Sequence, residues 1–250
     1  MNSPVPAIQT VNLTKRFGKG ANTLTAVNRL NLTVHEGELF SLLGVNGAGK
    51  TTTIRMLSCL SIPDEGDAFL LGDSIRTQSA AVKAKINVSP QETAVAPKLT
   101  VRENLELIAQ LYGCTRQEVA RRTDEMLCAL SLQEVASKRA RTLSGGMQRR
   151  LSIAMALITR PRILFLDEPT LGLDVLARRE LWRLIESLKG KITVVLTTHY
   201  MEEAAALSDR IGIMARGSLK AAGTLSELLE QTGTTSLEDA FVSFAEEVSA

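Results

Sequence analysis

A glycine-rich segment with a single lysine follows a short, mostly apolar run near residue 44. The run is Glu38–Leu43, and the next residues form the pattern Gly44-x4-Gly49-Lys50-Thr51. An apolar run of this length favours a buried strand, and the residues up to about Leu60 favour a helix. A loop of this pattern between a strand and a helix wraps phosphate with its backbone N–H groups. The sequence therefore predicts an α/β domain with a phosphate-binding loop.

Each part of this loop has an expected role in nucleotide binding. The N–H groups of Gly47 to Lys50 point at the phosphates, and the ammonium group of Lys50 reaches the β- and γ-phosphates. The hydroxyl of Thr51 is expected to bind Mg²⁺. The residues expected to hold the nucleotide here are Gly44, Asn46, Gly47, Ala48, Gly49, Lys50, Thr51 and Thr52.

A second apolar strand ends in two carboxylates. Ile163-Leu-Phe-Leu leads directly into Asp167 and Glu168. Because parallel strands end at the same edge of a sheet, Asp167 is expected near the phosphate loop, where it holds Mg²⁺ through water. Glu168 is then placed to polarise the water that attacks the phosphate. Such a strand alone is common, but its pairing with the phosphate loop indicates phosphate hydrolysis.

The residues from 98 to about 158 differ from the alternating strands and helices around them. Two capping boxes, Thr100-x-x-Glu103 and Thr115-x-x-Glu118, predict helix starts, and apolar residues recur at helical spacing. Farther on, Ser144 is the expected N-cap of an amphipathic helix that begins with two glycines. That helix start is a second site suited to anions. We therefore predict an inserted helical subdomain.

Strands and helices alternate again after this insertion, which favours a parallel sheet covered by helices on both faces. Two β segments are predicted within 7–34, joined by a turn at 18–22. Further strands are predicted at 67–71, 163–167, 192–197 and 211–214, and helices at 178–188, 201–207, 224–229 and 236–247.

Charge and composition exclude other classes of protein. Lys and Arg number 29 against 27 Asp and Glu, a balance that argues against broad nucleic-acid binding. No apolar run approaches the ~20 residues of a membrane span, and Met1–Ala7 lacks the features of a secretory signal. Work at a membrane would therefore require a membrane-bound partner. Four basic pairs are expected on solvated helix faces: Arg121-Arg122, Lys138-Arg139, Arg149-Arg150 and Arg178-Arg179.

In order and spacing, the motifs resemble the nucleotide-binding domain of ABC (ATP-binding cassette) transporters. The set consists of the phosphate loop, Gln91, Leu143–Gln148, Asp167-Glu168, Leu173-Asp174 and His199, and the resemblance covers nearly the whole chain. It implies an α/β P-loop NTPase (RecA-like) core with an N-terminal antiparallel β subdomain. Within one domain, 1–250, the expected parts are a core at 1–92 and 154–223, a helical subdomain at 93–153 and C-terminal helices at 224–250.

The resemblance also implies a dimer that sandwiches two ATP molecules. Ser144, Gly145 and Gly146 would contact the γ-phosphate of the ATP held by the other subunit, and Asp174 would lie at the same seam. Two equivalent sites in a homodimer are the simpler expectation, and a heterodimer stays open.

Within each subunit the resemblance implies four further roles. Gln91 would contact Mg²⁺ and the attacking water and connect the site to a membrane partner. His199 would hold the γ-phosphate, and Phe17 would stack on adenine, although an insertion around 20–23 lengthens the loop that follows it. The expected catalytic residues are Lys50, Gln91, Glu168 and His199, and the expected Mg²⁺ ligands are Thr51, Gln91 and Asp167.

Two segments resemble the cassettes of ABC-2-type exporters. They are Leu143-Ser-Gly-Gly-Met-Gln-Arg-Arg150 and Gly233-Thr-Thr-Ser-Leu-Glu-Asp-Ala-Phe241. The expected protein is an ATPase subunit that drives export of a drug, lipid, polysaccharide or ion through separate membrane permease subunits, at the cytoplasmic face of the cell membrane. An importer ATPase subunit and a non-transport ABC ATPase stay open as alternatives. Intact Lys50, Glu168 and His199 argue against a regulatory module without turnover.

Overall fold

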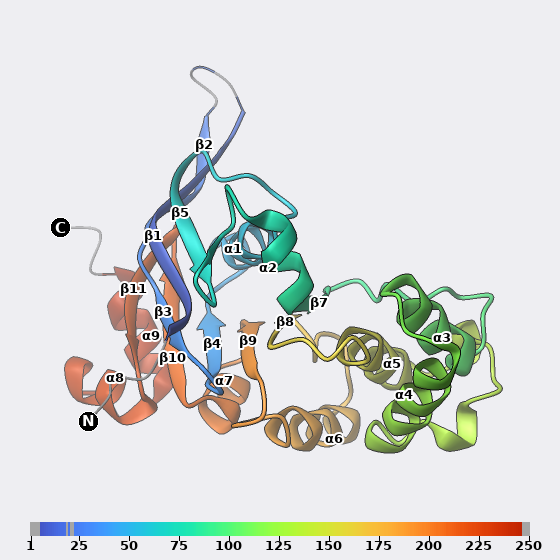
Figure 1. Ribbon diagram of the computed structural model, residues 1–250. Helices are drawn as coiled ribbons and strands as arrows, with labels where there is room; N and C mark the ends of the chain where they lie inside the picture. Colours follow the sequence, from blue (N-terminus) through green and yellow to red (C-terminus); the bar gives the residue numbers. More distant parts are fainter. Residues whose placement is uncertain (1–5, 19, 21–22, 247–250) are drawn as a thin grey trace.

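The computed structural model describes residues 6–18, 20 and 23–246, arranged as an α/β body with a helical lobe to one side (Figure 1). The strands are β1 (Pro6–Phe17), β2 (Leu24–Leu30), β3 (Thr33–His35), β4 (Leu39–Leu43), β5 (Glu65–Leu70), β6 (Asp73–Ser74), β7 (Ile86–Ser89), β8 (Ile163–Asp167), β9 (Thr193–Thr198), β10 (Arg210–Ala215) and β11 (Ser218–Gly223). The helices are α1 (Lys50–Leu57), α2 (Ser79–Lys85), α3 (Val101–Leu111), α4 (Arg116–Ala129), α5 (Gly145–Leu157), α6 (Val175–Glu186), α7 (Met201–Leu207), α8 (Leu225–Thr232) and α9 (Leu237–Glu246).

A six-stranded sheet in the order β11-β10-β4-β9-β8-β7 forms the centre of the body. Strands β10, β4, β9, β8 and β7 are parallel, and β11 closes one edge by pairing antiparallel with β10. The register pairs Leu43 with Thr198 and Asp167 with Thr197. The carboxyl ends of β4, β9, β8 and β7 therefore lie next to one another, and the segments that follow them meet at one edge of the sheet.

Both faces of this sheet are covered, as the apolar strands predict. In β8, Ile163 and Phe165 belong to the core shared with α1 and the N-terminal strands. Leu164 and Leu166 belong to the core shared with α3, α4, α5 and α6. Successive side chains of a strand point to opposite faces, so one apolar strand supplies two cores. The N-terminal strands form the separate antiparallel sheet β2-β1-β5-β6, and β3 pairs with β1.

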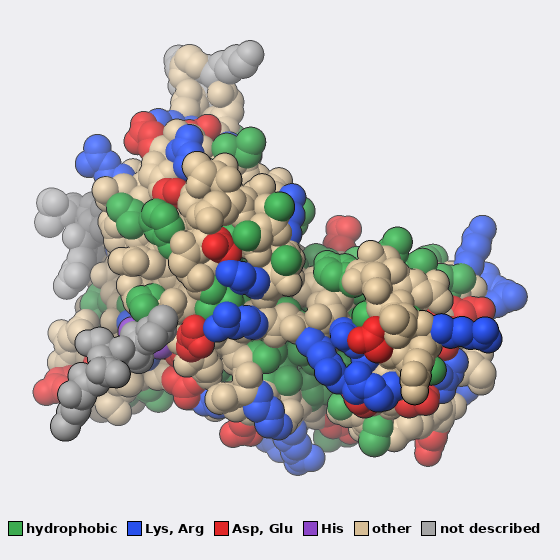
Figure 2. Space-filling model, in the orientation of Figure 1, with side chains coloured by type: hydrophobic (Ala, Val, Ile, Leu, Met, Phe, Trp, Pro, Cys, Tyr) green, Lys and Arg blue, Asp and Glu red, His purple; other side chains and the backbone are tan. Residues whose placement is uncertain are grey.

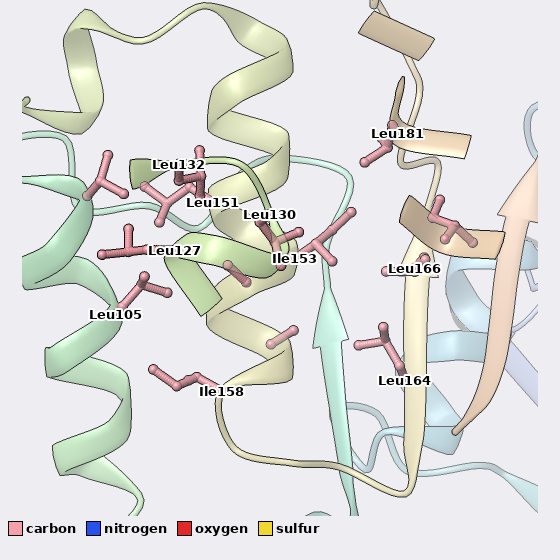
Figure 3. Packing of buried hydrophobic residues seen from close by; sticks show 14 of the residues in the cluster. Leu105, Leu127, Leu130, Leu132, Leu151, Ile153, Ile158, Leu164, Leu166 and Leu181 are labelled. Atoms are coloured by element: carbon pink, nitrogen blue, oxygen red, sulfur yellow. The ribbon is translucent and has the colours of Figure 1, made fainter. Parts of the chain in front are cut away.

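The helical lobe shares its core with the central sheet. Figure 3 shows Leu105 of α3, Leu127 of α4 and Ile153 of α5 in one apolar cluster with Leu164 of β8 and Leu181 of α6. The predicted capping boxes begin α3 and α4, with the Thr100 and Thr115 hydroxyls accepting from the backbone N–H groups of Glu103 and Glu118. Packing through α5 therefore connects the lobe to β8, the strand that ends at Asp167.

The predicted α/β class with an antiparallel β subdomain and inserted helices is confirmed. Five of the described strands and helices were not predicted: the short strands β3 and β6, the α2–β7 pair and the edge strand β11. Strand β7 reads Ile-Asn-Val-Ser, and its polar residues mask the apolar pattern. The predicted turn at 18–22, the insertion around 20–23, the segment Met1–Ala7 and the end of the last helix lie partly outside the described residues. None of the described helices is long and apolar enough to cross a bilayer.

Candidate active site

A cavity of about 430 Å³ opens at the carboxyl edge of the central sheet. The end of β1, the start of β2 and the segments that follow β4, β7, β8 and β9 all reach it. Its walls include Phe17, Leu24, Ala26, Asn46, Gly47, Ala48, Gly49, Lys50, Thr51, Thr52, Gln91, Glu168, Leu171 and His199. The structure therefore brings together the predicted adenine-stacking, phosphate-binding and catalytic side chains, although they span most of the sequence.

The phosphate loop is shaped by close packing behind it. Gly49 has φ +105°, and a Cβ there would lie 2.4 Å from the carbonyl oxygen of Ala26. Gly44 does not line the cavity; a Cβ on it would lie 2.4 Å from the carbonyl oxygen of Met214. Only glycine fits these two positions, because an L side chain would be strained at Gly49 and would collide with backbone at both.

Glu168 lies between a lysine and a histidine. Its Oε1 is 3.1 Å from Lys50 Nζ, and its Oε2 is 2.5 Å from His199 Nδ1. Lys50 Nζ also donates to the carbonyl oxygen of Gly44 at 2.7 Å. Both Lys50 and Glu168 are 5% exposed. A carboxylate held in this way is fixed in position and shielded from bulk water, which suits it to orient a reacting water molecule.

The backbone of Glu168 is strained and is held by Thr197. Glu168 has φ +50°, unusual for a residue with a side chain. Its N–H donates to the carbonyl oxygen of Thr197 at 3.1 Å and to the Thr197 hydroxyl at 3.0 Å. Strain of this kind costs of order 1–3 kcal/mol and concentrates at functional sites. The strain supports the predicted role of Glu168 independently of its side-chain contacts.

Asp167 and Thr51 form a pair suited to a hard divalent cation. Asp167 Oδ1 accepts from the Thr51 hydroxyl at 3.1 Å and from the Thr197 hydroxyl at 2.6 Å. All three predicted ligands, Thr51, Gln91 and Asp167, line one pocket next to the main cavity. These are oxygen donors of the kind Mg²⁺ prefers. With one carboxylate in this set, water molecules and nucleotide phosphate oxygens would supply the remaining ligands.

Arg149 corrects one prediction. The sequence placed it on a solvated helix face, but its side chain is 5% exposed. Its guanidinium group donates to the carbonyl oxygen of Pro90 at 2.6 Å and to that of Gln91 at 2.5 Å. Burial lowers the pKa of Arg149, and the charge of Asp167 acts in the opposite direction. Helix α5 thereby holds the backbone at Gln91, a link that the basic pair alone could not reveal.

The other predicted nucleotide contacts lie outside the cavity. Ser144 caps α5 by accepting from the N–H of Met147, and Asp174 caps α6 by accepting from the N–H groups of Leu176 and Ala177. Both capping side chains are exposed. A Cβ on Gly146 would lie 3.1 Å from the Cβ of Ala177, so the two helix starts are neighbours. Within one chain, this pair of helix starts is separate from the phosphate loop.

Three residues of the cavity wall were not predicted. Leu24 and Ala26 from β2 adjoin Phe17, and Leu171 follows the Glu168 loop. Phe17 itself is 47% exposed, with Lys15 Nζ 5.6 Å from its ring centroid. The three residues are small or aliphatic and belong to no motif, so only the fold brings them to the site. A second cavity, about 560 Å³, lies at the opposite ends of the parallel strands beside Gly37, Arg162 and Thr193, remote from the phosphate loop.

Comparison with known proteins places the chain beside transporter ATPases. The ABC transporter family model matches residues 27–171, more than half of the chain. The doxorubicin resistance ATP-binding protein DrrA of Mycobacterium tuberculosis is 41% identical over 225 residues, which cover 90% of this chain and 67% of that protein. The phospholipid-transporting ATPase ABCA3 of Homo sapiens is 42% identical over 229 residues, 92% of this chain. The match spans only 13% of ABCA3.

A solved structure shows the same fold. It is an ATP-binding cassette in a dimeric post-hydrolysis state bound to ADP and Pi. The TM-score is 0.79 with 29% identity, and the match covers 87% of this chain and 98% of that one. Sequence motifs, sheet topology and structural similarity thus agree on one family.

Proposed function

The chain belongs to the ABC transporter family, and from that premise we propose that it is the ATP-hydrolysing subunit of an ABC-2-type exporter. The observation that supports this proposal most strongly is that Lys50, Gln91, Glu168 and His199 line one cavity at the carboxyl edge of the sheet. Phe17, at the same cavity, presents an exposed ring that can stack on adenine. The cavity thus offers an aromatic face for the base and a cationic loop for the phosphates.

In this proposal the chain's own side chains position the γ-phosphate and the attacking water. Lys50 and the N–H groups of the phosphate loop stabilise the negative charge of the phosphates, and His199 holds the γ-phosphate. Glu168 orients the water and accepts its proton. Mg²⁺, held by Thr51 and Asp167 with Gln91 near it, would neutralise charge on the phosphates. These residues supply little covalent chemistry, since phosphoryl transfer depends chiefly on positioning and charge.

A second subunit would complete each site. Ser144 Oγ is the acceptor for the N–H of Met147, which leaves its own proton free to donate to a phosphate of another chain. Asp174 lies beside it, and Val175 and Leu176, the first two residues of α6, expose large apolar side chains. An exposed apolar patch next to a helix N-terminus is suited to pairing around an anion. We therefore propose that two copies pair around two ATP molecules.

The membrane partner would dock beside Gln91. Gln91 and Leu60 line the same pocket, and Leu60 and Ile62 are more than two-thirds exposed. Arg149 of α5 fixes the backbone of the loop at Gln91. A partner that moves this loop would therefore also move α5, the helix that Ser144 caps. We propose that permease subunits bind here and hold the chain at the cytoplasmic face of a membrane. Drug or lipid export is favoured by the relatives, DrrA and ABCA3.

The test is ATP hydrolysis by the purified chain with Mg²⁺. The wild-type protein should hydrolyse ATP, and Glu168→Gln should lower turnover by about 10³-fold, because loss of a general base costs ~10²–10⁴-fold. ATP binding should persist, and ATP should trap a Glu168→Gln dimer visible by size-exclusion chromatography. Glu134→Gln, which changes an exposed carboxylate, serves as the control. Turnover by Glu168→Gln within about threefold of wild type would show that Glu168 is not the general base.

A further inference from the structure

Helix α7 buries a carboxyl group that the hydrolysis scheme does not use. Glu203, in its first turn, is 0% exposed. Its Oε1 accepts from the indole N–H of Trp182 in α6 at 3.0 Å. Within the described part of the chain, Oε2 has no hydrogen-bond partner, and no Lys, Arg or His forms an ion pair with this group. Burying an ionised carboxylate without a cation is costly, so these surroundings favour the neutral carboxyl group.

The surroundings of Glu203 favour the neutral form. Burial is the largest influence and raises the pKa of Glu203, and the charge of Glu168 raises it further. The hydroxyls of Thr198 and Thr170 and the indole of Trp182 act in the opposite direction. The guanidinium group of Arg178 in α6 lies over the rings of Trp182 and Tyr200.

Strand β4 and helix α9 meet α7 through apolar side chains. Strand β4 contributes Leu43 and helix α9 contributes Phe241 to the apolar cluster that includes Ala204 of α7. The polar side chains that act on Glu203 belong to β9, α6 and the segment after β8. A neutral carboxyl suits these neighbours, because it is both donor and acceptor and can serve a hydroxyl and the indole at once.

These three neighbours lie next to the proposed reacting groups. Thr170 is two residues after Glu168, Thr198 directly precedes His199, and Trp182 belongs to the helix that Asp174 caps. Thr170 is 1% exposed, and its hydroxyl also lacks a partner among the described residues. Glu203 thus sits behind the site, where the loop of Glu168, the end of β9 and helix α6 come together.

We propose that Glu203 is a positioning residue for ATP hydrolysis, which lies bonded to Trp182 where these three segments meet and so supports the contact of Glu168 with His199. The proposal rests on the roles assigned to Glu168 and His199 in the proposed function. The contact it maintains is the 2.5 Å separation of Glu168 Oε2 from His199 Nδ1. Small displacements of such groups reduce turnover strongly while leaving substrate binding nearly unchanged.

Two substitutions separate a neutral positioning group from an ionised one. Glu203→Gln keeps the shape, one acceptor and one donor, and should retain kcat within about threefold of wild type. Glu203→Ala removes the connection and should lower kcat by about 10- to 10²-fold, with the KM for ATP changed less than about threefold. Glu202→Ala, which changes an exposed neighbour in the same turn, is the matched control.

Trp182 gives a readout that does not require ATP hydrolysis, because it is the only tryptophan in the chain. Its emission maximum in Glu203→Gln should equal that of the wild type at neutral pH. Because burial raises the pKa of Glu203 in the folded chain, the stability that this shift contributes is present below the unfolded-state pKa near 4.3 and is lost as the pH rises through the folded-state pKa. Wild-type thermal stability should therefore decline more with rising pH than that of Glu203→Gln.

The outcomes divide cleanly. Wild-type kcat in folded Glu203→Ala overturns the positioning role, and a kcat loss in Glu203→Gln equal to that in Glu203→Ala overturns the neutral form. If Glu203→Ala fails to fold, the Gln variant, the Trp182 emission and the pH slope of stability still decide. An inactive wild-type protein contradicts the proposed function, whereas a shifted Trp182 emission in an active Glu203→Gln protein contradicts only the account of Glu203.

Discussion

The two parts of the chain that would contact ATP are built in opposite ways. Lys50, Asp167 and Glu168 are buried: Lys50 at the start of α1 pairs with Glu168, and Asp167 at the end of β8 accepts from the Thr197 hydroxyl of β9. Ser144 and Asp174 are exposed, and each bonds only to the first turn of its own helix. The first group is complete within one chain, and the second presents unused hydrogen-bond capacity to the outside.

This difference indicates how one chain can hold a nucleotide and still need a partner to react. The buried group fixes the phosphate loop, the carboxylate pair and the histidine by contacts that need no other subunit. The exposed face has apolar side chains beside it, including Leu176, which is 74% exposed.

Figure 2 shows that Lys, Arg, Asp and Glu side chains are interspersed over the visible face, as the near-neutral composition leads one to expect.

The largest effect that separates the two regions is expected at Ser144. Ser144 and Thr115 cap different helices through the same hydroxyl contact, so Ser144→Ala and Thr115→Ala should each cost about 1 kcal/mol in unfolding free energy. Only Ser144→Ala should lower ATP turnover, by about 10²-fold, because it removes a donor to the γ-phosphate. Denaturant unfolding and steady-state ATPase assays measure the two quantities. Equal turnover in both variants would mean that Ser144 is a cap and nothing more.

An intermediate effect is expected at Arg149, which connects the regions. Arg149→Ala leaves the carbonyl oxygens of Pro90 and Gln91 without their buried donor and should cost about 1–3 kcal/mol in unfolding free energy. Turnover should fall about tenfold, since the backbone at Gln91 is released. Arg150→Ala removes a partly exposed ion pair with Glu180 and should change stability by about 0.5 kcal/mol or less. Matching losses in the two variants would contradict the link through Arg149.

The smallest effect concerns the helical lobe that carries Ser144. The N-cap backbone and hydroxyl of Thr115 lower the pKa of Glu118 below its usual value near 4.3. The stabilisation is therefore present above that value and is lost as the pH falls through the folded-state pKa. Glu118→Gln should have a slightly lower Tm than the wild type at neutral pH and should lose less on acidification to about pH 3. The control Glu134→Gln, outside any capping box, should show the wild-type acid dependence.

The sequence predicted the parts of the site that depend on local pattern. The phosphate loop, the strand ending in Asp167 and the caps at Thr100, Thr115 and Ser144 each combine residue type with spacing, and the structure has them at the expected ends of elements. These features are local, because a cap or a strand end is specified within a few residues. The α/β class with a parallel sheet followed from the order of such elements, and the P-loop NTPase core with its antiparallel β subdomain followed from the resemblance to ABC cassettes.

What the sequence could not predict depends on packing between distant segments. Arg149 and Glu203 are charged residue types on helices, where exposure is the usual outcome, and only the fold shows that α5 faces Pro90 and α7 faces Trp182. The edge strand β11 is short and rich in small residues, so its own sequence does not indicate that it pairs with β10. Buried polar contacts of this kind leave no periodic signal.

The central claim is that Lys50 and Ser144 of one chain serve different ATP molecules. The direct measurement is ATPase activity after subunit exchange between two inactive variants, Lys50→Ala and Ser144→Arg, with mixed dimers verified by tagged chains. In a mixed dimer one site collects both lesions and the other is intact. At equal amounts and random exchange, half of the dimers are mixed, so about one quarter of the wild-type activity should return.

The reciprocal mixture gives the decisive comparison. Wild type is mixed with the double variant Lys50→Ala, Ser144→Arg, so that each site of a mixed dimer carries one lesion if the two residues act across the interface. Only wild-type homodimers then work, and about one quarter of the activity should remain. If about one half remains and the first mixture stays inactive, Lys50 and Ser144 act on the same ATP, and the pairing of two half-sites is contradicted.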